Sequence, residues 1–416
     1  MERSIPARRE SQPGASHDSG VPRTSTEHYD EIMNREVARQ TRREIVRLAH
    51  AGLDWVTFAS RTAEQLDRVI PFEKACWHPV DPGTLLFTGS FTQNMDCSGP
   101  FLAKHEYVLE DVNKHAFLAG SGYRAGSLYQ ATHGDLSLSA RFRAARDMGD
   151  AFADELRGSF VVDGTYWGAA SLIREQGRPR FNGDEVRLLA SLSSPIAEGF
   201  RRAILISSVL VADDSDEAPG LVILDEQGNI ESISPAAQRW LDEIVEVPAT
   251  GRPQQSHVLQ VVAARARRAG ERADGTQLPA ETRARTHSGR WLLAYGMRLS
   301  GSLEGRTGVI IRPASAHDIA PLILDAYGLS ERERQVTRLC LTGLPTSEIA
   351  VALNISPYTV QDHLKSIFDK TGTRSRGELV GRIFLEGYFR GFDEFDRSEK
   401  GLATSPAKGR AEARKN

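Results

Sequence analysis

Cysteine is scarce in this chain of 416 residues, where Cys76, Cys97 and Cys340 form an odd, scattered set. None of them stands in a CxxC or CxxH spacing, so the sequence predicts neither a disulfide framework nor a zinc site. This use of cysteine fits a reducing compartment best.

Long apolar runs are missing as well. No stretch of about 18 apolar residues occurs, and the first residues, MERSIP, lack the apolar core of a signal peptide. We therefore expect a soluble, cytoplasmic protein that does not engage a membrane.

A strong charge of either sign is also absent. The formal net charge is -3, and the chain is 40% apolar and 26% charged, which is an ordinary globular composition. Any affinity for nucleic acid must then come from a local patch. The length predicts two or three domains.

Three common catalytic patterns, GxxxxGK[ST], HExxH and GxSxG, do not occur either. We predict that the protein is not an enzyme, with no catalytic residue, no cofactor and no metal ion.

The first folded region is predicted over 27–210, after a polar tail at 1–26 that we expect to be disordered. Apolar residues at helical spacing predict two helices before Ile70, and later patterns predict strands at 75–78 and 84–88 and a helix over 136–155. Asp163-Gly164 is typical of a tight hairpin turn. A last helical stripe over 184–210, interrupted at Pro195, favours a dimer seam.

Several of these segments resemble a GAF domain, of the form that precedes LuxR-type output domains. They are Glu155-Leu156-Arg157, the hairpin 163–168, the segment 174–181 and the helix that begins at Asp184. A ligand pocket in such a domain would be lined by aromatic residues, although plain core packing explains them too; the candidates are Trp77, Tyr107, Tyr123, Tyr129 and Trp167. Arg141 and Arg143 are expected on an exposed, salt-bridged helix face.

A second region resembles a PAS domain over 218–315, after an acidic linker at 211–219. Strands are predicted at 221–225 and 230–234, a capped helix follows Ser234-Pro235, and two more strands are predicted at 290–299 and 305–312. We thus expect two α/β domains, and a separating segment at 314–321 before the next unit.

The third region, 322–390, reads as four helical segments. The first two are predicted over 330–342 and 346–353, the third begins after Ser356, and the fourth begins at Ser375. Ser330/Glu333 and Ser375/Glu378 both have capping-box spacing. The run 329–334, Glu348-Ile349-Ala350, 353–356 and Ser375-Arg376 closely resemble the LuxR/GerE helix-turn-helix domain. The resemblance implies an all-α, four-helix domain that binds double-stranded DNA. A basic tail at 396–416 is expected to be disordered.

The resemblance also implies that the third helix lies in the major groove, with outward residues Tyr358, Thr359, Gln361, Asp362 and Lys365. Gln361 suits adenine, and the family more often has Lys there. Hydroxyl groups and cations nearby are candidate phosphate contacts, each also explained as a plain surface residue: Thr346, Ser347, Thr359, Lys370, Arg374 and Arg376. We expect Glu333 to be structural, tying helix ends or a neighbouring arginine.

These patterns predict a homodimeric transcriptional regulator in which sensor domains, with a possible small-molecule ligand, control DNA binding and act on RNA polymerase. Two other readings stay open. One is a thiol-based redox enzyme or sensor on the first domain, through Cys76 or Cys97. The other is a scaffold whose first two domains bind protein partners and no small molecule.

Overall fold

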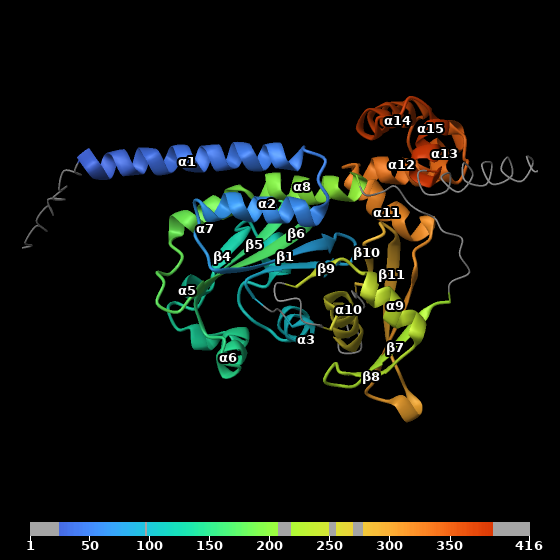
Figure 1. Cartoon of the computed structure of the whole chain (residues 1–416). Coiled ribbons are helices and arrows are strands. Elements are labelled where there is room, and N and C mark those ends of the chain that lie inside the picture. The colour runs from blue at the N-terminus through green and yellow to red at the C-terminus, as the bar shows by residue number, and fades with distance from the viewer. Residues whose placement is uncertain (1–24, 96–97, 207–217, 249–254, 269–277, 386–416) are drawn as a thin grey trace, which may run out of the picture.

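The computed structural model describes residues 25–95, 98–206, 218–248, 255–268 and 278–385, and contains two α/β domains and a helical C-terminal domain (Figure 1). Residues 1–24 of the tail predicted at 1–26, the tail predicted at 396–416, most of the acidic linker, and Cys97 lie outside the described residues. The last two residues of the first predicted tail, 25–26, already belong to a helix. None of the described helices is both long and apolar enough to cross a membrane.

The first domain is built on a sheet with the strand order β4-β5-β6-β1-β3-β9, in which β9 (Glu246–Val247) comes from the second domain, and β2 pairs with β1 at the side. Its own strands are β1 (Lys74–Asp81), β2 (Leu86–Phe87), β3 (Ser90–Gln93), β4 (Ala125–Ser127), β5 (Phe152–Val162) and β6 (Thr165–Glu175). One face is covered by α1 (Ser25–Ala49), α2 (Trp55–Asp67), α7 (Gly183–Ser191) and α8 (Ser193–Ile206) (Figure 1). The other face carries α3 (Gly99–Ala103), a π-helical turn (Lys104–Val108), α4 (His115–Gly120), α5 (Leu128–Ala131), a 3-10 turn (Leu136–Leu138) and α6 (Ala140–Asp147).

The apolar stripe of 184–210 packs inside the chain. Leu189, Leu192, Ile196 and Phe200 are buried in the core of the first domain, where Phe200 meets Phe58 of α2 edge to face. α1 and α2 both pack on α8. These four side chains therefore pack in the core of the first domain and do not form a dimer seam.

The hairpin prediction is confirmed, because β5 and β6 pair around Asp163 and Gly164, both at positive φ. The predicted helix over 136–155 is wrong in its second half. Its helical part ends at Asp147, Gly149 adopts a φ of 82°, and β5 begins at Phe152. Glycine at positive φ breaks the helix, and the polar residues that follow belong to a buried strand.

The second domain holds an antiparallel sheet with the order β10-β11-β12-β7-β8. Its strands are β7 (Gly220–Leu224), β8 (Ile230–Ile233), β10 (Glu281–Arg285), β11 (Trp291–Arg298) and β12 (Thr307–Pro313), and its helices are α9 (Pro235–Glu243) and α10 (His257–Arg268). The predicted strands and the capped helix are confirmed, and Ser234 caps α9 as expected. α10 and β10 were not predicted.

The two α/β domains share one core. α10 is buried over nearly its whole length, between α3 on one side and β11 and β12 on the other. A single apolar cluster joins Phe87 and Tyr166 of the first domain to Val222 and Leu292 of the second. The short strand β9 (Glu246–Val247), from the second domain, also pairs with β3 of the first sheet. The two domains therefore form one packed unit.

The C-terminal domain follows α11 (Ala316–Ala326) and consists of α12 (Glu331–Leu341), α13 (Thr346–Leu353), α14 (Pro357–Thr371), α15 (Arg376–Val380) and a π-helical turn (Gly381–Leu385). The four predicted helical segments are confirmed. The Ser330/Glu333 capping box forms, and Ser375 accepts a hydrogen bond from the Glu378 backbone N–H. Val336, Ile349, Val360 and Ile367 are fully buried in the core of this domain.

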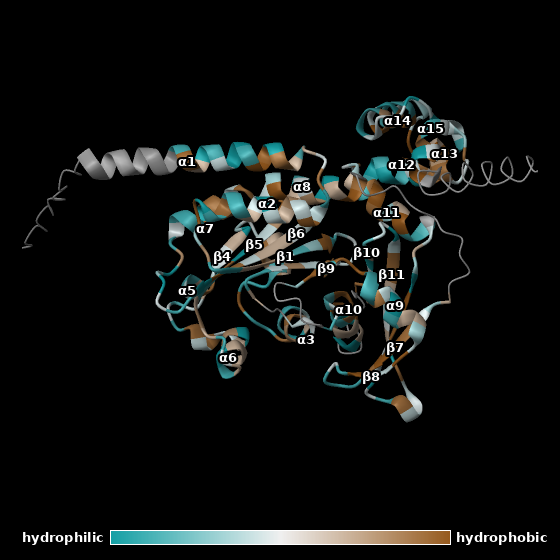
Figure 2. Cartoon of the chain, viewed as in Figure 1, coloured by the Kyte–Doolittle hydropathy of each residue, from teal (hydrophilic) through white to brown (hydrophobic). Residues whose placement is uncertain are grey.

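α11 replaces the expected separating segment at 314–321, so that prediction was wrong. Ile319, Leu322 and Ile323 are buried in the core of the first domain, while Leu324 belongs to the core of the C-terminal domain. α11 is correspondingly hydrophobic and α12 hydrophilic in Figure 2. The C-terminal domain is thus held against the others by a buried helix.

Candidate nucleic-acid interface

The turn between α13 and α14 is fixed by local backbone chemistry. Asn354 ends α13 in the left-handed conformation, at a φ of 53°. Ser356 then caps α14 by accepting a hydrogen bond from the Thr359 backbone N–H at 3.0 Å, and Pro357 stands at the first helical position. These features give the short, sharp connection of a helix-turn-helix.

α14 has one buried and one exposed face. Val360, Leu364 and Ile367 point into the core of the domain. The opposite face presents the predicted base-contacting residues Tyr358, Gln361, Asp362 and Lys365, and 73% of Tyr358 is exposed. Thr359 is half-buried, and its hydroxyl lies 2.9 Å from that of Ser356. α14 also lies on the side of the domain away from both sheets (Figure 1).

The predicted phosphate contacts divide into two groups. Thr346 and Ser347 start α13, whose N-cap residue Pro345 has no side-chain capping bond, so backbone N–H groups of the first turn remain available to an anion. Ser347 and the side chain of Arg374 are exposed.

Lys370 and Arg376 have partners within the domain. Lys370 Nζ lies 2.7 Å from Glu333 Oε2 and 3.2 Å from the Gly328 carbonyl oxygen. Arg376 donates to the carbonyl oxygens of Cys340, in the last turn of α12, and of Leu344, in the turn that follows. Their contact with phosphate stays a prediction, and the structure gives each of them a second role that the sequence did not reveal.

Glu333 is the polar centre of this domain. Its carboxylate accepts hydrogen bonds from the Ser330 backbone N–H, from Ser366 Oγ and from Lys370 Nζ, all at 2.6 to 2.7 Å. Burial raises the pKa of this carboxyl, but the hydrogen bonds from Lys370, Ser366 and Ser330 outweigh it and lower the pKa to about 2. Glu333 therefore has the expected structural role at a helix end, and it ties α12 to α14 through Lys370 and not through an arginine.

Replacement of Glu333 by glutamine should destabilise the protein by about 2 kcal/mol near neutral pH, because it removes a nearly buried charge partner of Lys370. A carboxyl with a lowered pKa stabilises the fold above its ordinary pKa of 4.5 and loses that contribution as the pH falls towards 2. The difference between wild type and variant in urea unfolding should therefore shrink as the pH is lowered from about 7 to about 3. Glu348→Gln, on the exposed side of α13, is the matched control; an equal loss there would contradict the assignment.

The five aromatic candidates for a ligand pocket do not gather around one site. Trp77 and Trp167 are buried in the core of the first domain, and Tyr107 lies in the core shared with the second domain. Tyr123 and Tyr129 are exposed by 73% and 38%. Three of the five aromatic candidates therefore pack in the cores of the α/β domains.

A buried group of charges lies in the first domain instead. Arg141 Nε donates to Glu155 Oε2 at 2.6 Å, and Arg157 donates from Nε to Glu155 Oε1 at 2.9 Å and from Nη1 to Glu106 Oε2 at 2.8 Å. Asp111 lies 3.3 Å from Arg141 Nη1. We call these five residues the charge cluster. The expectation that Arg141 is exposed was wrong, because only 4% of it is accessible.

The cysteine residues that the structure describes are not placed for thiol chemistry. Cys76 on β1 and Cys340 on α12 are both buried. Burial raises the pKa of the Cys340 thiol, which lowers the fraction of reactive thiolate. Their placement does not favour the redox reading.

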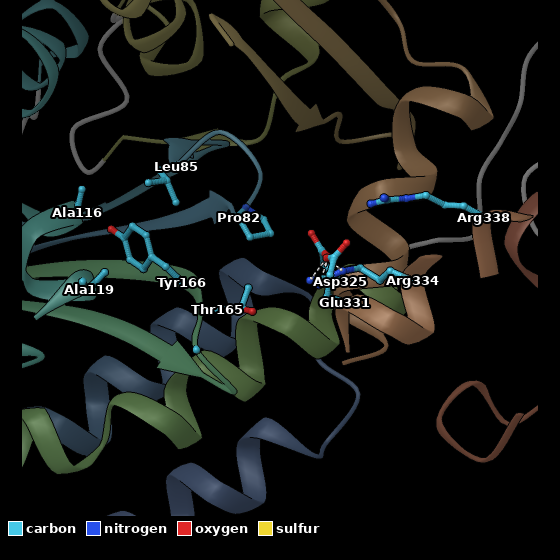
Figure 3. Close-up of a pocket in the computed structure, with 12 residues that line it drawn as sticks. Pro82, Leu85, Ala116, Ala119, Thr165, Tyr166, Asp325, Glu331, Arg334 and Arg338 are labelled. Carbon is cyan, nitrogen blue, oxygen red and sulfur yellow. Dashed lines mark hydrogen bonds and ion pairs between the residues drawn. The ribbon is translucent and has the colours of Figure 1, made fainter. Parts of the chain in front are cut away.

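A cavity of about 420 Å³ lies between the first domain and the C-terminal domain (Figure 3). We call it the interdomain pocket. One wall comes from the β1–β2 turn, α4 and the β5–β6 hairpin, and the other from α11 and α12. Its lining residues are Pro82, Leu85, Ala116, Ala119, Gly120, Gly164, Thr165, Tyr166, Asp325, Glu331, Arg334 and Arg338.

Residues 328–382 match the luxR family of bacterial regulatory proteins. The C-terminal domain is a luxR-family helix-turn-helix domain. This agrees with the family resemblance of the sequence and covers α12 to α15.

Curated relatives match this chain over short stretches. The transcriptional regulatory protein FixJ of Rhizobium meliloti (strain 1021) is 46% identical over 61 residues, which are 15% of this chain and 29% of FixJ. The transcriptional regulatory protein UhpA of Escherichia coli (strain K12) is 39% identical over 56 residues, 14% of this chain and 29% of UhpA. The chain thus spans less than a third of the length of these relatives.

Among solved structures, SdiA in complex with octanoyl-rac-glycerol is 12% identical, with 87% of this chain and 96% of SdiA covered. The TM-score of 0.25 is too low to indicate a shared overall fold.

Proposed function

We propose that this protein is a sequence-specific, DNA-binding transcriptional regulator. The observation that carries the proposal is α14, which presents Tyr358, Gln361, Asp362 and Lys365 on one exposed face while its other face fills the core of a luxR-family domain. A helix of this kind, after a short turn, fits the major groove. A regulator of this type acts in the cytoplasm.

The exposed face supplies side chains suited to base edges. The amide of Gln361 can donate and accept in one plane, as adenine requires, and Lys365 can reach guanine or a phosphate. Asp362 suits a cytosine amino group and repels phosphate elsewhere. Further contacts with the DNA backbone come from the start of α13, from the first and last turns of α14 and from the cations that follow α14: Thr346, Ser347, Thr359, Lys370, Arg374 and Arg376.

The two α/β domains act as sensors in this proposal, GAF-like over 27–210 and PAS-like over 218–315. The order of the second sheet supports the PAS-like part, since its first strand, β7, lies between its second strand and its last. Signals reach the DNA-binding domain through α11, which is buried on both sides. The active form is a homodimer on two half-sites, and it acts on RNA polymerase.

The test is selection of bound fragments from the source genome, followed by gel-shift titration of the selected site. The double variant Gln361→Ala/Lys365→Ala should bind that site at least about 30-fold more weakly, because each base contact contributes about 1 to 3 kcal/mol and two are lost. Arg239→Ala removes an exposed cation from α9 in the second domain and should leave the affinity unchanged. Unaltered binding by the double variant, or no enriched sequence for the wild type, would refute the proposal.

A further inference from the structure

The interdomain pocket is built from two unlike walls. The first domain contributes small and apolar side chains, Leu85, Ala116 and Ala119, together with Thr165 and Tyr166 of the β5–β6 hairpin. The opposite wall is charged, because α11 and α12 contribute two carboxylates and two guanidinium groups. A molecule in this pocket would therefore meet an apolar surface on one side and ionic groups on the other.

Three of the four charged side chains on this wall pair with one another. Arg334 donates from Nη1 to Asp325 Oδ1 at 2.7 Å and from Nη2 to Glu331 Oε2 at 2.9 Å, so one guanidinium engages both carboxylates. Gln335 takes the remaining oxygen of Glu331 at 3.2 Å. Each of the two carboxylates on this wall thus already has a donor.

Arg338 is in the opposite situation. It lies one helical turn after Arg334 on the same face of α12, and its side chain is exposed. Figure 3 shows its guanidinium pointing from α12 towards the wall formed by the first domain. No ion pair or hydrogen bond of this guanidinium is found among the described residues. Its planar set of N–H donors matches the two oxygens of a carboxylate.

We propose that the interdomain pocket binds a small organic carboxylate, whose carboxylate group pairs with Arg338 while its hydrocarbon part packs on Leu85, Ala116 and Ala119. A ligand held in this way contacts the first domain and α12 at once. It would favour the arrangement in which the luxR-family domain is docked against the sensors. The regulatory meaning of this site rests on the proposed function, but the binding itself does not.

Isothermal titration of the full chain with hexanoate and with benzoate tests the chemistry directly. Binding of at least one of them is expected, and hexanol and inorganic phosphate should bind at least about ten-fold more weakly, because one lacks the charge and the other the apolar part. No binding of either carboxylate overturns the proposal. Equal binding of hexanol or phosphate overturns the assigned ligand class.

Two variants locate the site. Arg338→Gln should weaken carboxylate binding about ten-fold or more, and Ala116→Trp should do the same by filling the pocket from its exposed edge. Arg332→Gln, on α12 but outside the pocket, is the matched control and should bind like the wild type. Undiminished binding by both pocket variants would place the ligand elsewhere and overturn the proposal.

Hydrogen exchange gives a second measurement that does not depend on the variants. The bound carboxylate should slow amide exchange in both α12 and the β5–β6 hairpin, because it contacts both. Protection of one without the other would contradict a bridging ligand. Gel-shift titration without ligand separates the two proposals: specific DNA binding without carboxylate binding refutes only the pocket, and the reverse refutes only the proposed function.

Discussion

Replacement of Glu155 by alanine is expected to cost about 3 to 5 kcal/mol, enough to unfold a large fraction of the protein. Glu155 is bound by both Arg141 and Arg157, and all three side chains are at most 6% exposed. Without the carboxylate, two guanidinium groups would face each other in the core with one shared partner missing. Urea unfolding followed by circular dichroism measures the loss.

The matched control is Glu175→Ala, at the exposed end of β6. Glu175 pairs with Lys74 at 3.3 Å, and 53% of its side chain is accessible. An exposed ion pair contributes about 0 to 1 kcal/mol, so this variant should be close to the wild type in stability. Similar losses of stability in both variants would show that the buried charge cluster contributes no more than an exposed ion pair.

The charge cluster also gives the protein a pH dependence. Burial raises the pKa of the Glu155 carboxyl, but Arg141 and Arg157 outweigh that effect and hold the pKa well below its ordinary value of 4.5. The stability that Glu155 contributes is therefore complete above the ordinary pKa and is lost as the pH falls below it. Glu106 has the opposite effect on the pH dependence of stability, since burial raises the pKa of its carboxyl.

Replacement of Val262 by aspartate should unfold both α/β domains together. Val262 is fully buried on α10 and packs against Gly296 of β11, so a charge there has no partner and no water. The cost should exceed about 4 kcal/mol. Because α10 also packs on α3, the loss should spread into the first domain.

Hydrogen exchange of the full chain distinguishes this outcome from independent domains. Amides of β1 and of β11 should lose protection at the same denaturant concentration in Val262→Asp. Val262→Ala, which removes volume without adding charge, should shift both transitions by a smaller, equal amount. Loss of protection in β11 alone would contradict a shared core.

Sequence patterns located the elements whose ends are set by local chemistry. Ser330 and Glu333 form the predicted capping box, Ser375 caps its helix without the reciprocal Glu378 bond, and Asp163-Gly164 turns the β5–β6 hairpin. These signals act over three or four residues, so they can be recognised without knowledge of the tertiary structure. The exposed face of α14 followed from the same helical periodicity.

The failures have the opposite cause. Glu155 and Arg157 are charged, which normally indicates an exposed position, yet they lie on the buried strand β5 because their partners arrive from α6 and the segment after α3. α11 was mistaken for a separating segment because Pro321 lies inside it and because its burial depends on two other domains. The pairing of Lys370 with Glu333 spans 37 residues and was missed for the same reason. Such long-range contacts leave no local pattern.

The pairing of β9 with β3 has a consequence for how this protein can be divided. β3 would otherwise be the edge of its sheet, with unpaired N–H and C=O groups that invite association with other chains. The residues that cover this edge lie more than 150 positions later, through Ser90 with Glu246 and Phe91 with Val247. A fragment that ends at residue 210 would carry an open strand and an uncovered apolar face, and we expect it to aggregate. The smallest fragment that stays in solution should therefore include both sheets.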